Sequence, residues 1–500
     1  MRFLLTLISL FVATFLDAQI TTAGLSGKVT DKNKEPIIGA NIIVTHEPSG
    51  TRYGACTNAN GRYFIQGMRA GGPYRVKISY VGMKTDEING ILLRLGEIFR
   101  HDVEMSESSE MLKEVVVIGK SGGNATKTGA AMNITSIDIN RMPSITHGIA
   151  DVVRLNPQIR VANNGAMYFV GTNSRYNSFR IDGVMNNDVF GLTMNGSNGG
   201  QAGTQPVSME TIEQIQINIA PFDVRQSGFT GGSINAITKS GTNDLRGVIY
   251  GFGNNQHLIG STYRMVDGNT SEKYTDQKEY QVGATLGGPI LKNRLFFYAN
   301  YEKTNKTYRN PYSVGDVASR VDAASASAIL ERLQQMAEEQ GVAYHGSLNA
   351  KDVYTKSDKA GLKLDWNIND RHKASFRWSI VSGKQLNSAS SADYLNASDF
   401  SYDFVSTTNS FVGELQSRLS NQVSNEFRVS YVHVRDRRQP GNPFPMIEIT
   451  NVGDGTLSLG NDRSSMANTL DQDIWSFTDN VMWYTGKHTF IVGTHNEFYK

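Results

Sequence analysis

Apolar and polar residues alternate along much of the chain, and this period of two is typical of β-strands that bury one face. The clearest example runs from residue 361 to residue 380. In its first half, Leu362, Leu364, Trp366 and Ile368 alternate with Lys363, Asp365 and Asn367. In its second half, Ala374, Phe376, Trp378 and Ile380 alternate with Ser375, Arg377 and Ser379. The polar triplet 369–371 separates the halves, so we expect a hairpin with one apolar and one polar face.

Further segments with the same alternation follow residue 244. They are Leu245–Asn254, Lys278–Gly287, Arg294–Asn305, Ser410–Leu419, Ser424–Arg435, Ile474–Tyr484 and His488–Lys500. With the hairpin, they predict about nine long strands. The connection between Thr304 and Lys356 is long and contains a helical stretch, Ala324–Glu339. The polar face fits the outside of a soluble sandwich, and it also fits the lumen of a membrane barrel, with Trp366 and Trp378 near the membrane interfaces.

A small β-rich unit precedes these strands, between residues 25 and 105. Short apolar segments predict strands at Ile42–Val44, Tyr63–Ile65 and Tyr74–Tyr80, and Asn60-Gly61 predicts a tight turn. Together they predict a small β-sandwich. The single cysteine, Cys56, excludes an intrachain disulfide, and we expect it to be a packed small side chain.

The first residues have the form of a secretory signal peptide. Arg2 precedes an apolar run, Phe3–Leu16, and the small residue Ala18 marks a cleavage point before Gln19. A retained membrane anchor is the competing interpretation, but the run is short for a span. Past residue 20, no apolar stretch reaches the ~18 residues of a membrane helix. The negative mean hydropathy is still compatible with a barrel, whose strands need apolar residues only at every second position.

Residues 125–242 combine strands, a short helix and glycine-rich loops. Ser144 is a candidate N-cap for a helix whose apolar residues recur at helical spacing until Pro157 ends it. Two strand segments follow, Met167–Val170 and Ser178–Ile181. The loop Gly191–Gly203 lacks the Gly-Lys-Ser/Thr ending of a phosphate-binding loop, so we expect a structural loop at the apex of this unit.

Charge and motifs exclude several function classes. A formal net charge of +2 over 500 residues provides no broad basic field for nucleic acid. His101 and Glu104 have the spacing of a zinc carboxypeptidase motif, but residues three apart on a strand point to opposite faces and cannot share a metal. The nine histidines are scattered, without the context of a catalytic acid, base or nucleophile. We therefore expect no enzyme, no cofactor, no metal site and no nucleic-acid partner.

One set of residues in the N-terminal unit carries a family resemblance. These residues are Gly27–Asp31, Pro36, Gly39-Ala40, Thr57, Asn60–Tyr63 and Tyr80–Gly82. In this order they are similar to the carboxypeptidase regulatory-like domain, which is a non-catalytic accessory module. The resemblance covers nearly the whole unit and agrees with the predicted sandwich.

A second set of segments lies in the middle of the chain. It consists of Phe179–Val184, Met209–Ile215 and Gly231–Asn243. These segments resemble the plug of TonB-dependent outer-membrane receptors, which implies that Ile181, Asp182 and Gly183 form a plug motif. Asn187–Gly191 and Ala220–Arg225 are similar to the Oar-like branch rather than to the starch-utilisation glycan importers.

A valine-rich segment lies between the two resembling units and consists of Glu114, Val115, Val116, Val117 and Ile118. Its β-branched residues favour extended structure, and the flanking Ser106–Glu110 and Ser121–Asn124 favour mobility. The residues alone fit a last sandwich strand, a stiff linker, or a strand that pairs with a partner's sheet edge. The family resemblance implies the last of these, a TonB box that the periplasmic protein TonB grips.

The expected fold is dominated by β-structure: a small N-terminal β-sandwich, a mixed α/β plug and the first part of a large antiparallel transmembrane β-barrel. We expect a signal peptide at 1–18, the sandwich at 19–105, a linker with the TonB box at 106–124, the plug at 125–242 and barrel strands at 243–500. About nine strands cannot close a plugged cylinder of about 22 strands. An open edge in hydrocarbon leaves backbone groups unsatisfied, so we expect the sequence to be C-terminally incomplete.

The resemblance implies active uptake of an external ligand across the outer membrane of a Gram-negative cell, with the N-terminal domain in the periplasm. The implied partners are TonB, outer-membrane lipid and an external ligand, with a surface lipoprotein as a further candidate. A peptide or protein is the expected ligand class, with glycan and metal chelate as alternatives. An outer-membrane adhesin or signalling receptor on the same scaffold is the alternative function, and a secreted array of sandwiches is a third.

Overall fold

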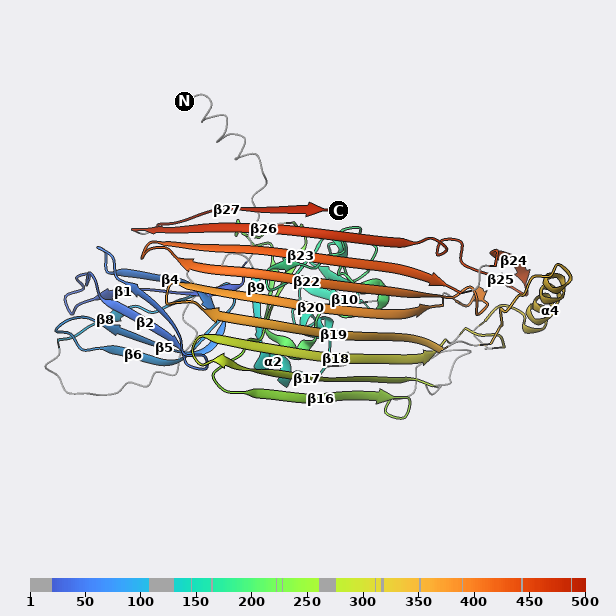
Figure 1. Ribbon diagram of the computed structural model, residues 1–500, viewed down its shortest axis with the longest axis horizontal. Helices are drawn as coiled ribbons and strands as arrows, with labels where there is room; N and C mark the ends of the chain where they lie inside the picture. The colour runs from blue at the N-terminus through green and yellow to red at the C-terminus, as the bar shows by residue number, and fades with distance from the viewer. Residues whose placement is uncertain are drawn as a thin grey trace, which may run out of the picture.

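The computed structural model describes residues 20–107, 130–259 and 276–500, with short gaps at 145, 163–164, 222, 227, 311, 316–318, 350–351, 389, 442–443 and 487. The predicted signal peptide lies outside the described residues. Figure 1 shows an elongated molecule, with a small sandwich at one end, a large sheet with a central unit behind it, and a small cap at the other end. Helices in the described part of the chain are too short or too polar to span a membrane.

The N-terminal unit is a sandwich of one mixed sheet and one antiparallel sheet. One sheet has the order β4-β1-β7, with β8 also paired to β1, and the other has the order β3-β2-β5-β6. The strands are β1 Thr22–Thr30, β2 Asn41–His46, β3 Thr51–Cys56, β4 Arg62–Arg69, β5 Gly71–Ser79, β6 Asp86–Leu93, β7 Ile98–Arg100 and β8 Val103–Glu104. Alternate residues such as Leu25, Ile42 and Ile78 meet in one fully buried core. The predicted sandwich is therefore confirmed.

Two local predictions in the sandwich have opposite outcomes. Gly61 has φ +70 in the turn between β3 and β4, as the Asn60-Gly61 pair predicts. A Cβ at Gly61 would lie 2.5 Å from the carbonyl oxygen of Val29, so the turn also needs glycine for space. The prediction that Cys56 is packed is wrong, because the side chain is exposed. The alternation of β3 buries Ala55 and turns the next residue outward.

The central unit, residues 130–242, is built around a mixed five-stranded sheet of order β13-β12-β15-β14-β9. The strands of the central unit are β9 Ala130–Thr135, β10 Ile159–Val161, β11 Met167–Phe169, β12 Ser178–Ile181, β13 Val184–Met185, β14 Ile212–Ile219 and β15 Gly232–Thr238. Of these, β10 and β11 pair with each other outside the five-stranded sheet. Its helices are α2 Ser136–Arg141, α3 Ile149–Val153 and the short 3-10 turns η1 Ser174–Tyr176, η2 Gly200–Ala202 and η3 Met209–Thr211. Isoleucines from β12, β14 and β15 form the core against α3.

The predicted cap of the short helix is wrong. Gly148, not Ser144, is the N-cap of α3, and it makes no side-chain cap hydrogen bond. The Ser144 hydroxyl instead donates to the Asp151 carboxylate at 2.6 Å. Because Asp151 itself lies in the first turn of α3, the serine holds the loop to the helix without capping it.

Nine long strands form one antiparallel sheet, here called the wall sheet, of order β16-β17-β18-β19-β20-β22-β23-β26-β27. Its strands are β16 Arg246–Asn255, β17 Lys278–Leu291, β18 Leu295–Arg309, β19 Asp352–Asn367, β20 His372–Asn387, β22 Tyr402–Arg418, β23 Val423–Pro440, β26 Thr469–Thr485 and β27 His488–Tyr499. All predicted strands are present, and most are longer than predicted. In the predicted hairpin, Lys363 lies opposite Arg377 and Leu364 lies opposite Phe376.

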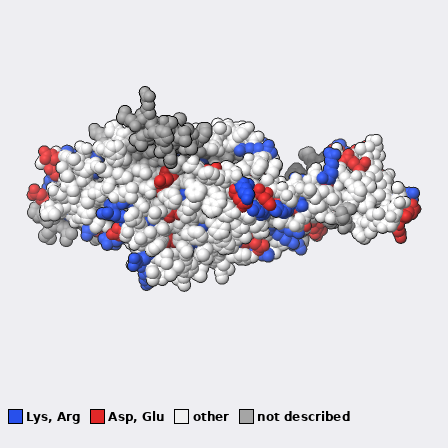
Figure 2. Space-filling view, turned by 45° about the horizontal axis from the view of Figure 1, so that its top comes forward, with Lys and Arg blue, Asp and Glu red and all other residues white. Residues whose placement is uncertain are grey.

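The two faces of the wall sheet have the reverse polarity of a soluble sandwich. The face against the central unit, here called the covered face, buries charged residues such as Glu302, Lys359 and Arg428. The outer face exposes large apolar side chains, including Trp366, Phe376, Phe411, Trp475, Phe477 and Trp483. Figure 2 shows a broad uncharged area over the sheet, with charged residues gathered mainly toward the ends. Such an outer face is stable against lipid rather than against water.

Three connections at the far end of the wall sheet fold together into the cap. They contribute α4 Ala323–Glu339, β21 Tyr394–Asn396, β24 Ile447–Val452 and β25 Gly455–Leu459. The helix matches the predicted stretch within one residue. Val321, Leu395 and Leu457, one from each connection, share a buried core. At the opposite end, short turns join the strands, and the sandwich contacts this end through Arg418, which donates to the carbonyl oxygen of Gly54.

Buried His46 in the sandwich makes stability depend on pH. Burial, assisted by the charge of Arg69, lowers the pKa of His46 to about 3 from 6.5. Because the folded pKa is lower, the unfolded chain binds the additional proton, and stability present above pH 6.5 falls as the pH drops toward 3. We expect a loss of about 2 kcal/mol at pH 5.

The measurement is hydrogen exchange of the β2 and β5 amides at pH 7 and pH 5, corrected for intrinsic exchange rates. His46→Asn removes the titrating group, so the pH dependence should flatten even if the variant is less stable throughout. An unchanged pH dependence in this variant would contradict the assignment to His46.

Candidate functional site

The turn between β12 and β13 projects from the central unit onto the wall sheet. It contains Asp182 with φ +46 and Gly183 with φ +77, both in the left-handed region. The Asp182 backbone N–H donates to the carbonyl oxygen of Ala236, and the carboxylate accepts from the Thr238 N–H at 2.8 Å and the Thr238 hydroxyl at 2.7 Å. The neighbouring strand β15 thus fixes the aspartate. We call residues 181–184 the corner.

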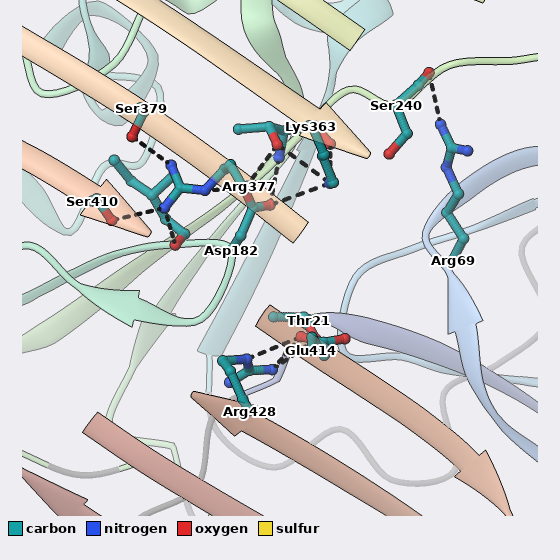
Figure 3. Close-up of polar contacts among 12 residues, drawn as sticks. Thr21, Arg69, Asp182, Ser240, Lys363, Arg377, Ser379, Ser410, Glu414 and Arg428 are labelled. Atoms are coloured by element: carbon teal, nitrogen blue, oxygen red, sulfur yellow. Dashed lines mark hydrogen bonds and ion pairs between the residues drawn. The ribbon is translucent and has the colours of Figure 1, made fainter. Parts of the chain in front are cut away.

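Two cations of the wall sheet meet the Asp182 carboxylate. Arg377 Nε lies 3.0 Å from one oxygen, and Lys363 Nζ lies 3.6 Å from the other. Figure 3 shows both side chains converging on Asp182 from adjacent strands. Burial raises the pKa of Asp182, but the charges of Lys363 and Arg377 and the hydrogen bonds from Thr238 outweigh burial and hold the pKa below its usual value. The carboxylate is therefore ionised at neutral pH.

A second charged cluster lies on the wall sheet beside Gly183. Arg428 donates to Glu414 at 2.7 Å and also pairs with Glu426. A Cβ at Gly183 would lie 2.4 Å from Arg428 Nη1, so only glycine leaves space for the guanidinium. The arginine also donates to the Thr21 hydroxyl at 2.9 Å, so the sandwich reaches the same cluster (Figure 3).

A third buried contact holds the segment before β14. Glu302 of β18 accepts from Lys359 Nζ at 2.7 Å, from the Ser208 hydroxyl at 2.6 Å and from the Tyr250 hydroxyl at 2.8 Å. Glu302 is fully buried, and the side chain of Lys359 is only 6% exposed. Ser208 immediately precedes η3, and Ile212 after η3 pairs with Thr238, so this ion pair holds the same end of the central sheet as Asp182 does.

The sandwich covers the glutamine-bearing face of the same central sheet. Gln214 accepts from the Leu95 N–H at 2.8 Å and donates to the Leu93 carbonyl at 3.0 Å, and Gln216 donates to the Leu95 carbonyl at 2.6 Å. Where the three parts meet, they border a cavity of about 120 Å³ that is partly open to solvent. Its lining includes Thr21, Arg69, Asp182, Glu213, Lys363 and Glu414.

The arrangement serves mechanical holding rather than covalent chemistry. Buried ion pairs contribute little net stability against an apolar alternative, but removal of one partner is costly because it leaves a charge unpaired. Such contacts specify one position for the central unit. Among the described residues, no group of three or more His, Cys, Asp or Glu side chains is placed to hold a metal ion. His101 instead pairs with Asp86 at 3.1 Å, and Glu104 pairs with Lys34.

The predicted site residues fall into two groups. Ile181, Asp182 and Gly183 form the corner, and each has a definable role: Ile181 packs in the core, Asp182 pairs, and Gly183 admits an arginine. The predicted TonB box, Glu114–Ile118, lies outside the described residues.

Sequence reasoning placed Lys363 and Arg377 on a polar face but named no partner for them. It did not identify Glu302, Lys359, Glu414, Glu426 or Arg428, whose only sequence signal is a charge at an inward position of an alternating strand.

Comparisons with known families agree with this architecture. The carboxypeptidase regulatory-like domain family matches residues 24–106. The outer membrane beta barrel domain family matches residues 237–321 and 304–500, together more than half of the chain. The resemblance of the N-terminal unit to the carboxypeptidase regulatory-like domain is thereby confirmed, and the predicted barrel strands fall within the second match.

Two curated relatives and one solved structure are similar over part of their length. The TonB-dependent transporter Oar of Myxococcus xanthus is 27% identical in an alignment of 312 residues. The alignment covers 59% of this chain and 28% of that protein. The probable TonB-dependent siderophore receptor PirA of Acinetobacter baumannii is 29% identical in an alignment of 197 residues. The alignment covers 34% of this chain and 22% of that protein. The outer membrane transporter YddB of Escherichia coli has the same fold, with a TM-score of 0.52, 14% identity and coverage of 74% of this chain and 48% of that one.

The chain spans less than a third of either curated relative. Both relatives are named for transport or reception. The apolar outer face of the wall sheet agrees with an outer-membrane location. The chain belongs to the outer-membrane β-barrel family and is a homologue of TonB-dependent outer-membrane receptors that carries an N-terminal carboxypeptidase regulatory-like domain.

Proposed function

We propose that the protein is a TonB-dependent importer, in which the central unit is a plug that moves when TonB pulls on Glu114–Ile118. The observation that carries the proposal is the polar contact between the central unit and the wall sheet. Its ion pairs and hydrogen bonds can be replaced by water contacts in turn as the unit moves. A continuous apolar core between the two parts would resist such movement, since separation would expose its apolar area to water.

The place of the TonB box in the chain supports a defined path for the force. The box lies between the sandwich and β9, the first strand of the central sheet. Within the described residues β9 pairs with β14 alone, along the register Gln214↔Thr135 to Ile219↔Ala130. A pull from the periplasm would therefore reach this edge strand first. An edge strand can leave the sheet without breaking the other strand pairs, so the plug need not unfold as a whole.

The corner is the second barrier to movement in this mechanism. Displacement of the plug must separate Asp182 from Arg377 and Lys363, and all three charges must then be hydrated or find new partners. Water entering from the cavity at the junction can supply that hydration. The ion pairs of the corner thus hold the plug in place, and they still allow it to move once they are hydrated.

The cap supports a role in ligand binding at the extracellular end. It lies at the end of the wall sheet away from the sandwich, and its three connections share one core. A folded cap presents a broad surface, which suits a peptide or protein better than a small chelate. We therefore propose a peptide or protein ligand, with glycan and metal chelate as the alternatives.

The TonB box can be tested by removing a main-chain donor. Val116→Pro eliminates one N–H and disfavours strand pairing, so we expect about a tenfold or greater loss of affinity for the purified periplasmic domain of TonB. Val116→Thr keeps the β-branched shape and the N–H, and it should bind as the natural protein does. Equal affinity of the proline variant would exclude this segment as the TonB contact.

The corner can be tested by neutralising its carboxylate. Asp182→Asn leaves Arg377 and Lys363 with less compensation, so we expect the plug to loosen by about 3–5 kcal/mol at most. The measurement is hydrogen exchange of the β12 and β15 amides under increasing urea. Asp244→Asn is the matched control, because Asp244 is 70% exposed and pairs with an exposed arginine. Equal protection in both variants would show that the ion pairs do not hold the plug.

A further inference from the structure

The N-terminal sandwich holds two neighbouring strands of the plug sheet, β14 and β15. The glutamine contacts described above bind β14 to backbone groups at and just after the end of β6. Ile237 of β15 is 6% exposed and belongs to the hydrophobic core of the sandwich. Beyond β15, Arg69 of β4 donates to the carbonyl oxygen of Ser240 at 3.0 Å (Figure 3) and to that of Gly241 at 3.3 Å. The sandwich therefore binds both strands and the segment that leads from β15 to the wall sheet.

The edge strand β9 is bound less firmly. Among the described residues, a single hydrogen bond joins β9 to the sandwich, from Asn133 to the Glu97 carboxylate at 2.8 Å. Ile134 is the buried residue of β9, whereas β14 is buried along most of its length. A strand with one neighbour and little buried surface separates at a lower free energy than a strand that is paired on both sides.

The same sandwich is anchored to three strands of the wall sheet. The Thr21 hydroxyl donates to Glu414 of β22 at 3.0 Å and accepts from Arg428 of β23 at 2.9 Å. Asn367, at the end of β19, donates to the Thr51 hydroxyl at 2.8 Å. Two of these contacts involve an ionised partner, and hydrogen bonds to charged groups are stronger than those between neutral groups. The sandwich thus connects β14 and β15 of the plug to the wall sheet.

We infer that the sandwich is a periplasmic clamp, which holds β14 and β15 on the wall sheet and leaves β9 as the strand that yields to a pull. The inference rests on the proposed role of the central unit as a plug, and it gives the accessory domain a part in that mechanism. Because the TonB box lies between the sandwich and β9 in the chain, tension acts on β9 at one end and on the clamp at the other. The clamp is held by three wall strands and β9 by one neighbour, so β9 separates first.

The test is hydrogen exchange of the full-length protein, expressed from its own gene and purified in detergent without TonB. A Cβ at Gly67 of β4 would lie 3.6 Å from the Cβ of Gln416 in β22, a spacing that a disulfide bond spans. Gly67→Cys with Gln416→Cys, in a Cys56→Ser background, therefore links the clamp to the wall. We expect oxidation to slow exchange of the β15 amides about tenfold, equivalent to about 1.4 kcal/mol, and to leave the β9 amides unchanged. Comparison of the oxidised and reduced forms of one variant cancels the strain at Gly67, where φ is +66.

Asn41→Cys is the matched control for the cross-link. Asn41 lies directly opposite the natural Cys56 in the β2–β3 pair, so oxidation joins two strands within the sandwich and leaves the wall free. Exchange of the β15 amides should then stay as in the reduced form. Thr21→Val tests the clamp in the opposite direction, because it keeps the side-chain shape and removes the hydroxyl at the wall. We expect the β15 amides to exchange roughly tenfold faster. Thr45→Val, on the outward row of β2, should leave them unchanged.

Unchanged β15 exchange in both the cross-linked protein and Thr21→Val would overturn the clamp. Slower exchange of the sandwich amides alone would also overturn it, because the sandwich would then dock without holding the plug. Equal slowing of the β9 amides would contradict the assignment of β9 as the yielding strand. If the cysteine pair does not fold or oxidise, Thr21→Val against Thr45→Val decides alone.

Failure of the clamp is distinguishable from failure of the importer, since the exchange experiment contains no TonB. A clamp that protects β15 in a protein that does not bind TonB retains this inference and rejects the motor. TonB binding together with unchanged β15 exchange does the reverse.

Discussion

The ionised carboxylate of Asp182 between Arg377 and Lys363 is the contact on which the arrangement of this protein depends. It joins a largely buried turn of the central unit to two strands of the wall sheet. A buried pair of this kind adds little to net stability, yet it penalises every position in which one partner is alone. It therefore specifies where the central unit sits, and it can be exchanged for hydration when the unit moves.

The surroundings of this contact divide into charged pairs and one apolar cluster. The ion pairs at Asp182, Glu302 and Arg428 fix the position of the central unit on the wall sheet. Val184 of the corner packs in an apolar cluster with Val412, Val432, Val434 and Ile474 of the wall sheet. This division has a physical reason: charged pairs are directional but readily hydrated, whereas apolar contacts are poorly directional and exclude water.

The sandwich takes part in the same junction rather than hanging free from it. Its Thr21 hydroxyl binds the Arg428 cluster, and its Leu93 and Leu95 backbone groups pair with glutamines of the central sheet. Movement of the central unit must therefore break contacts with the sandwich as well as with the wall sheet. Since the chain runs from the sandwich through the predicted TonB box to β9, all three parts meet where the proposed force is applied.

Periodicity in the sequence determined much of this fold, because the alternation of a strand is local. The alternating runs predicted every long strand of the wall sheet and the hairpin at 361–380, and a separate helical stretch predicted α4. Local features with competing solutions were less certain: Ser144 binds Asp151 instead of capping α3, and Cys56 lies one position out of the buried row of β3.

The sequence also identified the Ile181–Gly183 corner by resemblance, but only the tertiary structure decided its partners. Asp182 and Arg428 are far apart along the chain, and nothing local indicates that Gly183 must admit an arginine from β23. The same holds for the apolar cluster around Val184, whose members lie on four strands and each resemble an ordinary core residue. A strand pattern fixes which face a residue occupies, whereas pairing across faces depends on how sheets dock.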